Sequence, residues 1–88
     1  MENLIKELRE DFQIPPYASD DTLQRFLTEG IAYFTNLVPD ADFDKDQIYR
    51  SLLKNHAYYA YNHVLNEFYE NYRKTILGWQ IGQEVTET

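Results

Sequence analysis

The chain has 88 residues, no cysteine, and a net charge of −7 from 15 acidic and eight basic side chains. A chain this short forms one domain with a thin core, and oligomerisation commonly supplements such a core. The absence of cysteine excludes disulfides, thiolate metal sites and cysteine nucleophiles, and the negative charge disfavours general nucleic-acid binding. With no apolar leader and no apolar run near ~18 residues, we expect a cytoplasmic protein with no membrane association.

The first half of the chain carries two amphipathic patterns with clear start and stop signals. Apolar residues from Leu4 to Phe12 share a face of a short helix that ends before Pro15-Pro16. Ser19, followed by two aspartates, predicts the N-cap of a second helix, which Pro39 closes. Gly30 falls inside the apolar stripe of this second helix, which predicts a close approach by a neighbouring helix.

The second half of the chain predicts one long helix. Asp44, with Gln47 three residues later, resembles a capping box. No glycine or proline interrupts the sequence from Gln47 to Leu77, so a helix ending at Gly78 would span on the order of 45 Å. We therefore expect a single all-α domain, residues 1–88, built as a small bundle of three main helices, short, medium and long. Residues 79–88 would form a flexible or partner-docking tail.

This long segment is apolar on more than one face. One stripe has helical spacing and is typical of a core-facing surface: Tyr49, Leu53, Ala57, Ala60, Val64 and Phe68. A second set lies well round from it: Tyr58, Tyr61, Leu65, Tyr69 and Ile76. A helix that is apolar on two sides is usually covered on two sides, by its own domain and by a partner. The predicted protein-interface residues are Tyr58, Tyr61, Leu65, Tyr69, Tyr72 and Trp79.

Two constellations could suggest chemistry, and both fit a structural interpretation better. The aspartates Asp40, Asp42 and Asp44 copy the start of a calcium loop, but the turn glycine and the closing glutamate are missing. His56 and His63 lie two turns apart, about 10 Å, too far to share one ion; we interpret them as partly exposed histidines at the core boundary or in a subunit contact. Phosphate loops and nucleophile elbows are absent from the sequence, so we expect no catalytic residues, no metal and no cofactor.

Three features in fixed order carry a resemblance to a known family. They are a Ser-Asp-Asp-x-Leu helix start at residues 19–23, an amphipathic helix through Ala32 and Phe34, and a long helix finishing in Phe-Tyr-Glu-Asn-Tyr-Arg at residues 68–73. In this order they resemble the small head-tail connector proteins of tailed bacteriophages and prophages. That family has an Asp-Asp-x-Leu start and a Tyr-Glu-Asn-Arg-like ending, which Tyr72 interrupts here. The resemblance covers residues 4–73.

The resemblance implies a virion assembly protein in the neck between head and tail, assembled in the bacterial cytoplasm. Its partners would be copies of itself in a ring, the portal protein and a tail-side completion protein. A ring needs a contact between two different surfaces of the subunit, which a helix with two apolar faces could provide. An acidic inner wall would let DNA pass without binding it, and no sequence-specific nucleic-acid binding is expected. The alternative is a small acidic bacterial regulatory or antitoxin-like protein that binds one protein partner.

Overall fold

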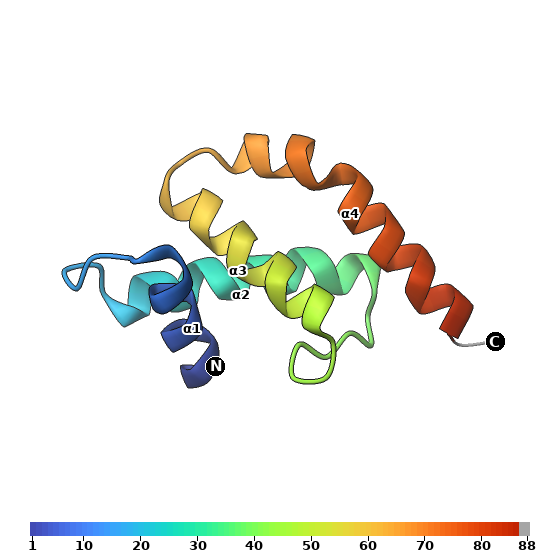
Figure 1. The fold of residues 1–88 in the computed structure, drawn as a ribbon, viewed down its shortest axis with the longest axis horizontal. Coiled ribbons are helices and arrows are strands. Elements are labelled where there is room, and N and C mark those ends of the chain that lie inside the picture. Colours follow the sequence, from blue (N-terminus) through green and yellow to red (C-terminus); the bar gives the residue numbers. More distant parts are fainter. Residues whose placement is uncertain (87–88) are drawn as a thin grey trace.

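The computed structural model describes residues 1–86, and it confirms the all-α class. It contains four helices within that range rather than three main ones: α1 (Glu2–Phe12), α2 (Asp20–Leu37), α3 (Gln47–Tyr61) and α4 (Leu65–Thr86). Figure 1 shows α3 crossing α2, with α1 at one end of the pair and α4 running along the other side of α3. The longest dimension of the molecule is 46 Å.

The predicted limits of the first two helices are confirmed. After α1, Gln13 adopts a left-handed backbone with φ of 51°, and the N–H of Ile14 donates to the Arg9 carbonyl at 3.1 Å. Ser19 caps α2, because its hydroxyl accepts the N–H of Thr22 at 3.1 Å. Local sequence signals are sufficient here, since caps and prolines act on the nearest backbone groups.

The predicted cap of the third helix is wrong by two residues. Asp46, not Asp44, caps α3: its Oδ1 accepts the N–H groups of Ile48 at 3.0 Å and Tyr49 at 3.1 Å. The backbone N–H of Asp44 instead donates to Asp42 Oδ1 at 2.9 Å, so Asp44 belongs to a turn before the helix. Asp44 and Asp46 are both suitable caps. Asp46 is used because it also binds Trp79, far along the chain.

The prediction of one long helix is also wrong. The chain leaves the helix after Tyr61, and His63 takes a left-handed conformation with φ of 61°. This turn places α4 beside α3, so the stripe from Tyr49 to Phe68 is divided between two helices. The predicted stop at Gly78 is contradicted as well, because α4 continues to Thr86. Residues 79–86 of the predicted tail are therefore helical, and residues 87–88 lie outside the described residues.

The crossing of α2 and α3 confirms the close approach expected at Gly30. A Cβ built on Gly30 would lie 3.1 Å from His56 Nδ1 and 3.3 Å from Leu53 Cδ2. These distances leave almost no room for a side chain, so the glycine allows the two helices to pack in contact. His56 is only 1% exposed, so its interpretation as a partly exposed residue is wrong. Its burial follows from this crossing, which the sequence pattern of α3 alone does not reveal.

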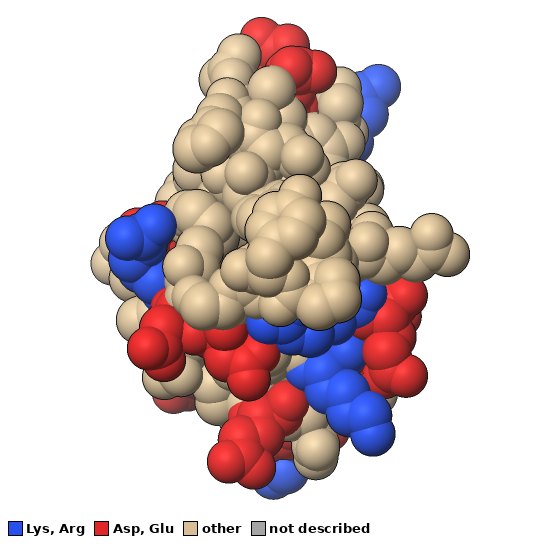
Figure 2. Space-filling model, turned by 90° about the vertical axis from the view of Figure 1, so that its left-hand side faces the viewer, with Lys and Arg blue, Asp and Glu red and all other residues tan. Residues whose placement is uncertain are grey.

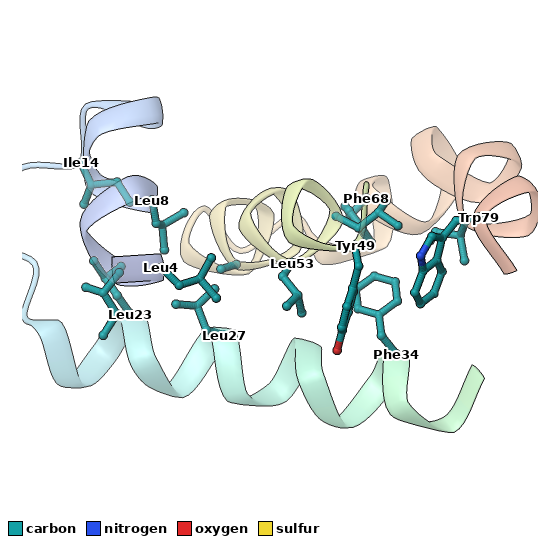
Figure 3. Packing of buried hydrophobic residues seen from close by; sticks show 14 of the residues in the cluster. Leu4, Leu8, Ile14, Leu23, Leu27, Phe34, Tyr49, Leu53, Phe68 and Trp79 are labelled. Atoms are coloured by element: carbon teal, nitrogen blue, oxygen red, sulfur yellow. The ribbon is translucent and has the colours of Figure 1, made fainter. Parts of the chain in front are cut away.

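The core has two ends of different composition, which Figure 3 shows side by side. We call the part between α1 and the start of α2 the leucine end, with buried Leu4, Leu8, Leu23 and Leu27. We call the part among α2, α3 and α4 the aromatic end, with buried Phe34, Tyr49, Phe68 and Trp79. A single continuous cluster of buried side chains joins the two ends, so all four helices share one core.

Ion pairs fasten α1 to α3 at the surface of the leucine end. Arg50 and Lys54 of α3 both bind Glu7 of α1, and Lys54 Nζ also lies 2.7 Å from Asp11 Oδ2. Arg50 holds the pKa of Glu7 at about 2, so this carboxylate stays ionised. Figure 2 shows Lys and Arg interspersed with Asp and Glu over the lower part of the face at this side of the molecule. The cluster therefore acts as a structural tie between helices.

Candidate interaction surface

The six predicted interface residues are spread over α3 and α4, and most of their surface serves the protein's own core. Trp79 is 3% exposed, and its Nε1 donates to Asp46 Oδ2 at 2.8 Å. Tyr58 stacks on Phe12 of α1 with ring centroids 4.2 Å apart. Tyr61 and Leu65, on either side of the α3–α4 turn, are half-buried against the core.

The remaining two tyrosines connect α4 to α3 through their hydroxyl groups. Tyr69 OH lies 3.1 Å from His56 Nε2, and burial raises the pKa of this tyrosine. Tyr72 stacks on Phe68 with centroids 4.8 Å apart and donates to Asn55 Oδ1 at 2.9 Å. These contacts hold α4 in place. Only the outer edges of Tyr69 and Tyr72 remain for a partner.

An open groove runs between the C-terminal end of α2 and the outer side of α4. We call it the α2–α4 groove; it has a volume of about 410 Å³. Its lining is mostly apolar, with one cation and one amide at the rim. The apolar residues are Tyr33, Leu37, Tyr69, Ile76 and Leu77, the cation is Arg73 and the amide is Gln80. Of the predicted residues, only Tyr69 lies in it. The polar tip of Tyr69 is turned to His56, so the groove presents mainly carbon surface.

Two exposed aliphatic side chains of α4 extend this apolar surface. Leu77 is 54% exposed and Ile81 is 49% exposed, and they lie one helical turn apart. We call them the α4 ridge. Neither is among the predicted interface residues, because a helix ending at Gly78 leaves Ile81 outside it and separates Leu77 from its apolar neighbour one turn further on. A helix continued to Thr86 would have shown Tyr69, Arg73, Leu77 and Ile81 at four-residue spacing on one side.

A second groove lies on the opposite flank of α4, against α3. We call it the α3–α4 groove; it has a volume of about 340 Å³. It is lined by Gln47, Ile48, Ser51, Leu52, Tyr72 and Thr75. Ile48 is 54% exposed, although it lies in the first turn of α3 close to the core. The aspartate-rich connector between α2 and α3 leads directly into this groove.

His56 is the buried histidine of the aromatic end. Burial lowers its pKa to about 4, so the imidazole is neutral at neutral pH. Its Nδ1 has no hydrogen-bond partner among the described residues and faces Gly30. The tautomer protonated on Nε2, which donates to Tyr69 OH, is favoured because it buries an unpaired acceptor rather than an unpaired N–H. His56 is thus a packing and positioning group.

The structure separates the residues that could have suggested metal binding. His63 lies in the α3–α4 turn with an exposed side chain, whereas His56 is buried under α4. Within residues 1–86, no group of three histidine, aspartate or glutamate side chains is placed to hold a metal ion. Nor is any described helix long and apolar enough to span a membrane.

Comparisons of the chain with protein-family models, with curated proteins and with solved structures give no match.

Proposed function

We propose that the chain is a non-enzymatic assembly protein that associates with copies of itself and with other virion components, as a head-tail connector between portal and tail. The observation that supports this function most strongly is the apolar surface left on α4 after its own fold is complete. The α4 ridge exposes Leu77 and Ile81, and the α2–α4 groove beside it is lined by the half-buried Tyr33 and Leu37. An apolar surface of this kind on a small protein typically marks a contact site.

Ring assembly requires a contact between two different surfaces, because head-to-tail contacts are heterologous. The two grooves lie on opposite flanks of α4 and differ in lining. In the proposed ring the α4 ridge of one copy packs into the α3–α4 groove of the next. Arg73 stands at the rim of the first groove.

The excess of acidic residues suits a protein that surrounds DNA without holding it. With a net charge of −7, the subunit offers few cations to replace the counter-ions of phosphate. In the proposed ring this charge allows DNA to pass during packaging and ejection, and the portal and tail-side proteins bind the two rims.

The test is the mass of the protein in solution as a function of concentration, alone and mixed with a phage portal ring, with electron microscopy of the products. We expect association that increases with concentration or with the portal, and closed rings in the images. The alternative, a regulatory or antitoxin-like protein, predicts at most a small closed oligomer. A monomer at every concentration, with no complex on the portal, contradicts the connector function.

The double variant Leu77→Lys, Ile81→Lys tests the surface itself. It places two charges on the α4 ridge without touching the buried side chains, so we expect at least about tenfold weaker association. Tyr17→Lys is the matched control, since Tyr17 is 85% exposed in the loop between α1 and α2, far from both grooves. Equal weakening by the control would show that added charge, rather than the ridge, is responsible.

A further inference from the structure

The turn between α3 and α4 closes in a way that usually requires glycine. The N–H of Val64 donates to the Tyr59 carbonyl and the N–H of His63 donates to the Ala60 carbonyl, both at 3.0 Å. This is the Schellman arrangement, in which the residue at the position of His63 is left-handed and most often glycine. A residue with a Cβ pays about 1–2 kcal/mol for that conformation. The closed turn is therefore strained at one residue.

The sequence on both sides of this turn is compatible with an uninterrupted helix. Residues 47–77 contain no glycine or proline, and the residues of the turn have only moderate helix penalties. The other left-handed residue, Gln13, differs in this respect. Pro15-Pro16 follow it directly and prevent α1 from continuing. No proline follows His63, so the sequence does not prevent α3 from continuing through this residue.

The contacts that α4 makes with its own α2 and α3 could be made in the same way with the α2 and α3 of another copy. The ring of Phe68 packs on Phe34 of α2, and Tyr69 meets His56 of α3. Further along, Trp79 binds Asp46, and Gln80 reaches the Leu37 carbonyl. These partners lie on α2 and α3, so α4 docks on the crossing of those two helices as one unit.

A continuous helix from Gln47 to Thr86 would be about 60 Å long at 1.5 Å per residue. The whole closed molecule is only 46 Å in its longest dimension. In such a rod α4 points away from its own α2–α3 crossing and cannot cover it. Only the α4 of a second copy can then fill the site and bury the exposed aromatic end.

We propose that α3 and α4 join into one helix on assembly, and that α4 then packs onto the α2–α3 crossing of a second copy of this chain. The inference rests on the proposed function, because it describes how copies associate. Each copy gives its α4 to one neighbour and receives α4 from the other, which makes a heterologous contact that can close into a ring. The core contacts are the same in both states. The difference is the relief of the turn at His63, balanced against the entropy of association.

Two substitutions at His63 shift this balance in opposite directions. His63→Ala favours the continuous helix, since alanine is the best helix former and is strained when left-handed. His63→Gly favours the closed turn, since glycine adopts that conformation freely and is a poor helix former. In sedimentation velocity, we expect the association constant of the alanine variant to exceed that of the glycine variant by at least about tenfold.

The matched controls are Gln13→Ala and Gln13→Gly. They change the left-handed residue in the same way at a helix end that prolines block, so the two should associate equally. Circular dichroism of each variant checks that it is folded, and the glycine variant, which suits the closed turn, keeps the test valid if the alanine variant is unstable.

Cross-linking identifies the exchanged helix directly. Ser51 and Thr75 line the same groove from α3 and α4, both are exposed, and the chain has no cysteine of its own. Ser51→Cys copies are mixed with Thr75→Cys copies and treated with a short thiol cross-linker. Exchange predicts a product joining the two variants that His63→Gly suppresses.

The outcomes separate this inference from the proposed function. Association that occurs but does not respond to either change at His63 overturns the exchange and leaves self-assembly standing. A cross-linked product that survives His63→Gly and disappears with the ridge variant assigns the contact to surface docking instead. If no variant associates at any concentration or with the portal, both proposals fail.

Discussion

The leucine end and the aromatic end of the core are held together by different kinds of contact. At the leucine end, flexible aliphatic side chains fill the space between α1 and α2, and the ion pairs of Glu7 fasten α1 to α3. At the aromatic end, rigid rings meet edge to face and their polar tips bind specific partners, as Trp79 binds Asp46. Both grooves border this end, where another copy could fill them.

The largest effect expected from this comparison is that of Phe34→Ala. The Phe34 ring contacts Tyr49, His56, Phe68 and Trp79 edge to face, so its loss leaves a cavity at the centre of the aromatic end. We expect the free energy of unfolding to fall by about 3–5 kcal/mol.

Leu23→Ala is the comparison at the leucine end, where the neighbouring aliphatic side chains can partly relax into the gap. Urea denaturation followed by circular dichroism measures both variants. A smaller loss for Phe34→Ala than for Leu23→Ala would show that the aromatic end is not the main source of stability.

The next largest effect is that of Asp46→Ala, because Asp46 both caps α3 and binds Trp79 of α4. The substitution removes the cap of α3 and leaves the buried Nε1 of Trp79 without an acceptor. We expect the free energy of unfolding to fall by about 2–4 kcal/mol, from the lost cap and the lost hydrogen bond together. Asp44→Ala is the control, with an expected loss below about 1 kcal/mol, since its contact with Arg50 is exposed and 3.4 Å long. Equal losses would restore Asp44 as the cap.

A third prediction concerns the pH dependence of the free energy of unfolding, which reports on His56 at the aromatic end. The folded state holds the pKa of His56 at about 4, below the value near 6.5 of the unfolded chain, so the unfolded state binds the proton first as the pH falls. Stability should decrease below pH 6.5, by up to about 1.4 kcal/mol per pH unit, until the pH reaches about 4. The contribution of Glu7 begins to fall only below about pH 4.5, the ordinary pKa of the unfolded side chain, and is lost as the pH approaches its folded pKa of about 2.

Urea midpoints between pH 7 and pH 5 therefore report on the histidine. His56→Gln should flatten the curve in this range. His63→Gln, which removes the other imidazole at an exposed position, is the control and should keep the slope. A slope that persists in the His56 variant and vanishes in the His63 variant would contradict the assignment.

The smallest predicted effects are a pair of glycine substitutions with opposite signs. Gly78→Ala meets no atom within 4 Å and should stabilise α4 by up to about 1 kcal/mol. Gly30→Ala gains the same helix propensity but presses on the buried His56 and Leu53, so we expect a net loss of about 1 kcal/mol. Thermal unfolding of both variants checks the sign. Stabilisation by Gly30→Ala would mean that the α2–α3 crossing is looser than its distances indicate.

Several parts of the fold could be predicted because their causes are local in the sequence. The cap at Ser19 and the end of α1 before Pro15 both follow from residues within a few positions. The predicted interface residues lie on two helices rather than one. Trp79 among them is buried within the chain, and Leu77 and Ile81 are exposed on α4.

The sequence by itself determined that the chain is all-α, where its first two helices begin and end, and that it carries more apolar surface than one helix face can bury. Tertiary structure decided the break at His63 and the choice of Asp46 as a cap. A left-handed histidine costs about 1–2 kcal/mol locally. Burying a large side chain such as Phe68 contributes about 1.5–3 kcal/mol, and Ile76 and Trp79 are buried with it. The free energy favours the turn only when the burial of the whole core is included, and a local sequence pattern carries no information about that burial.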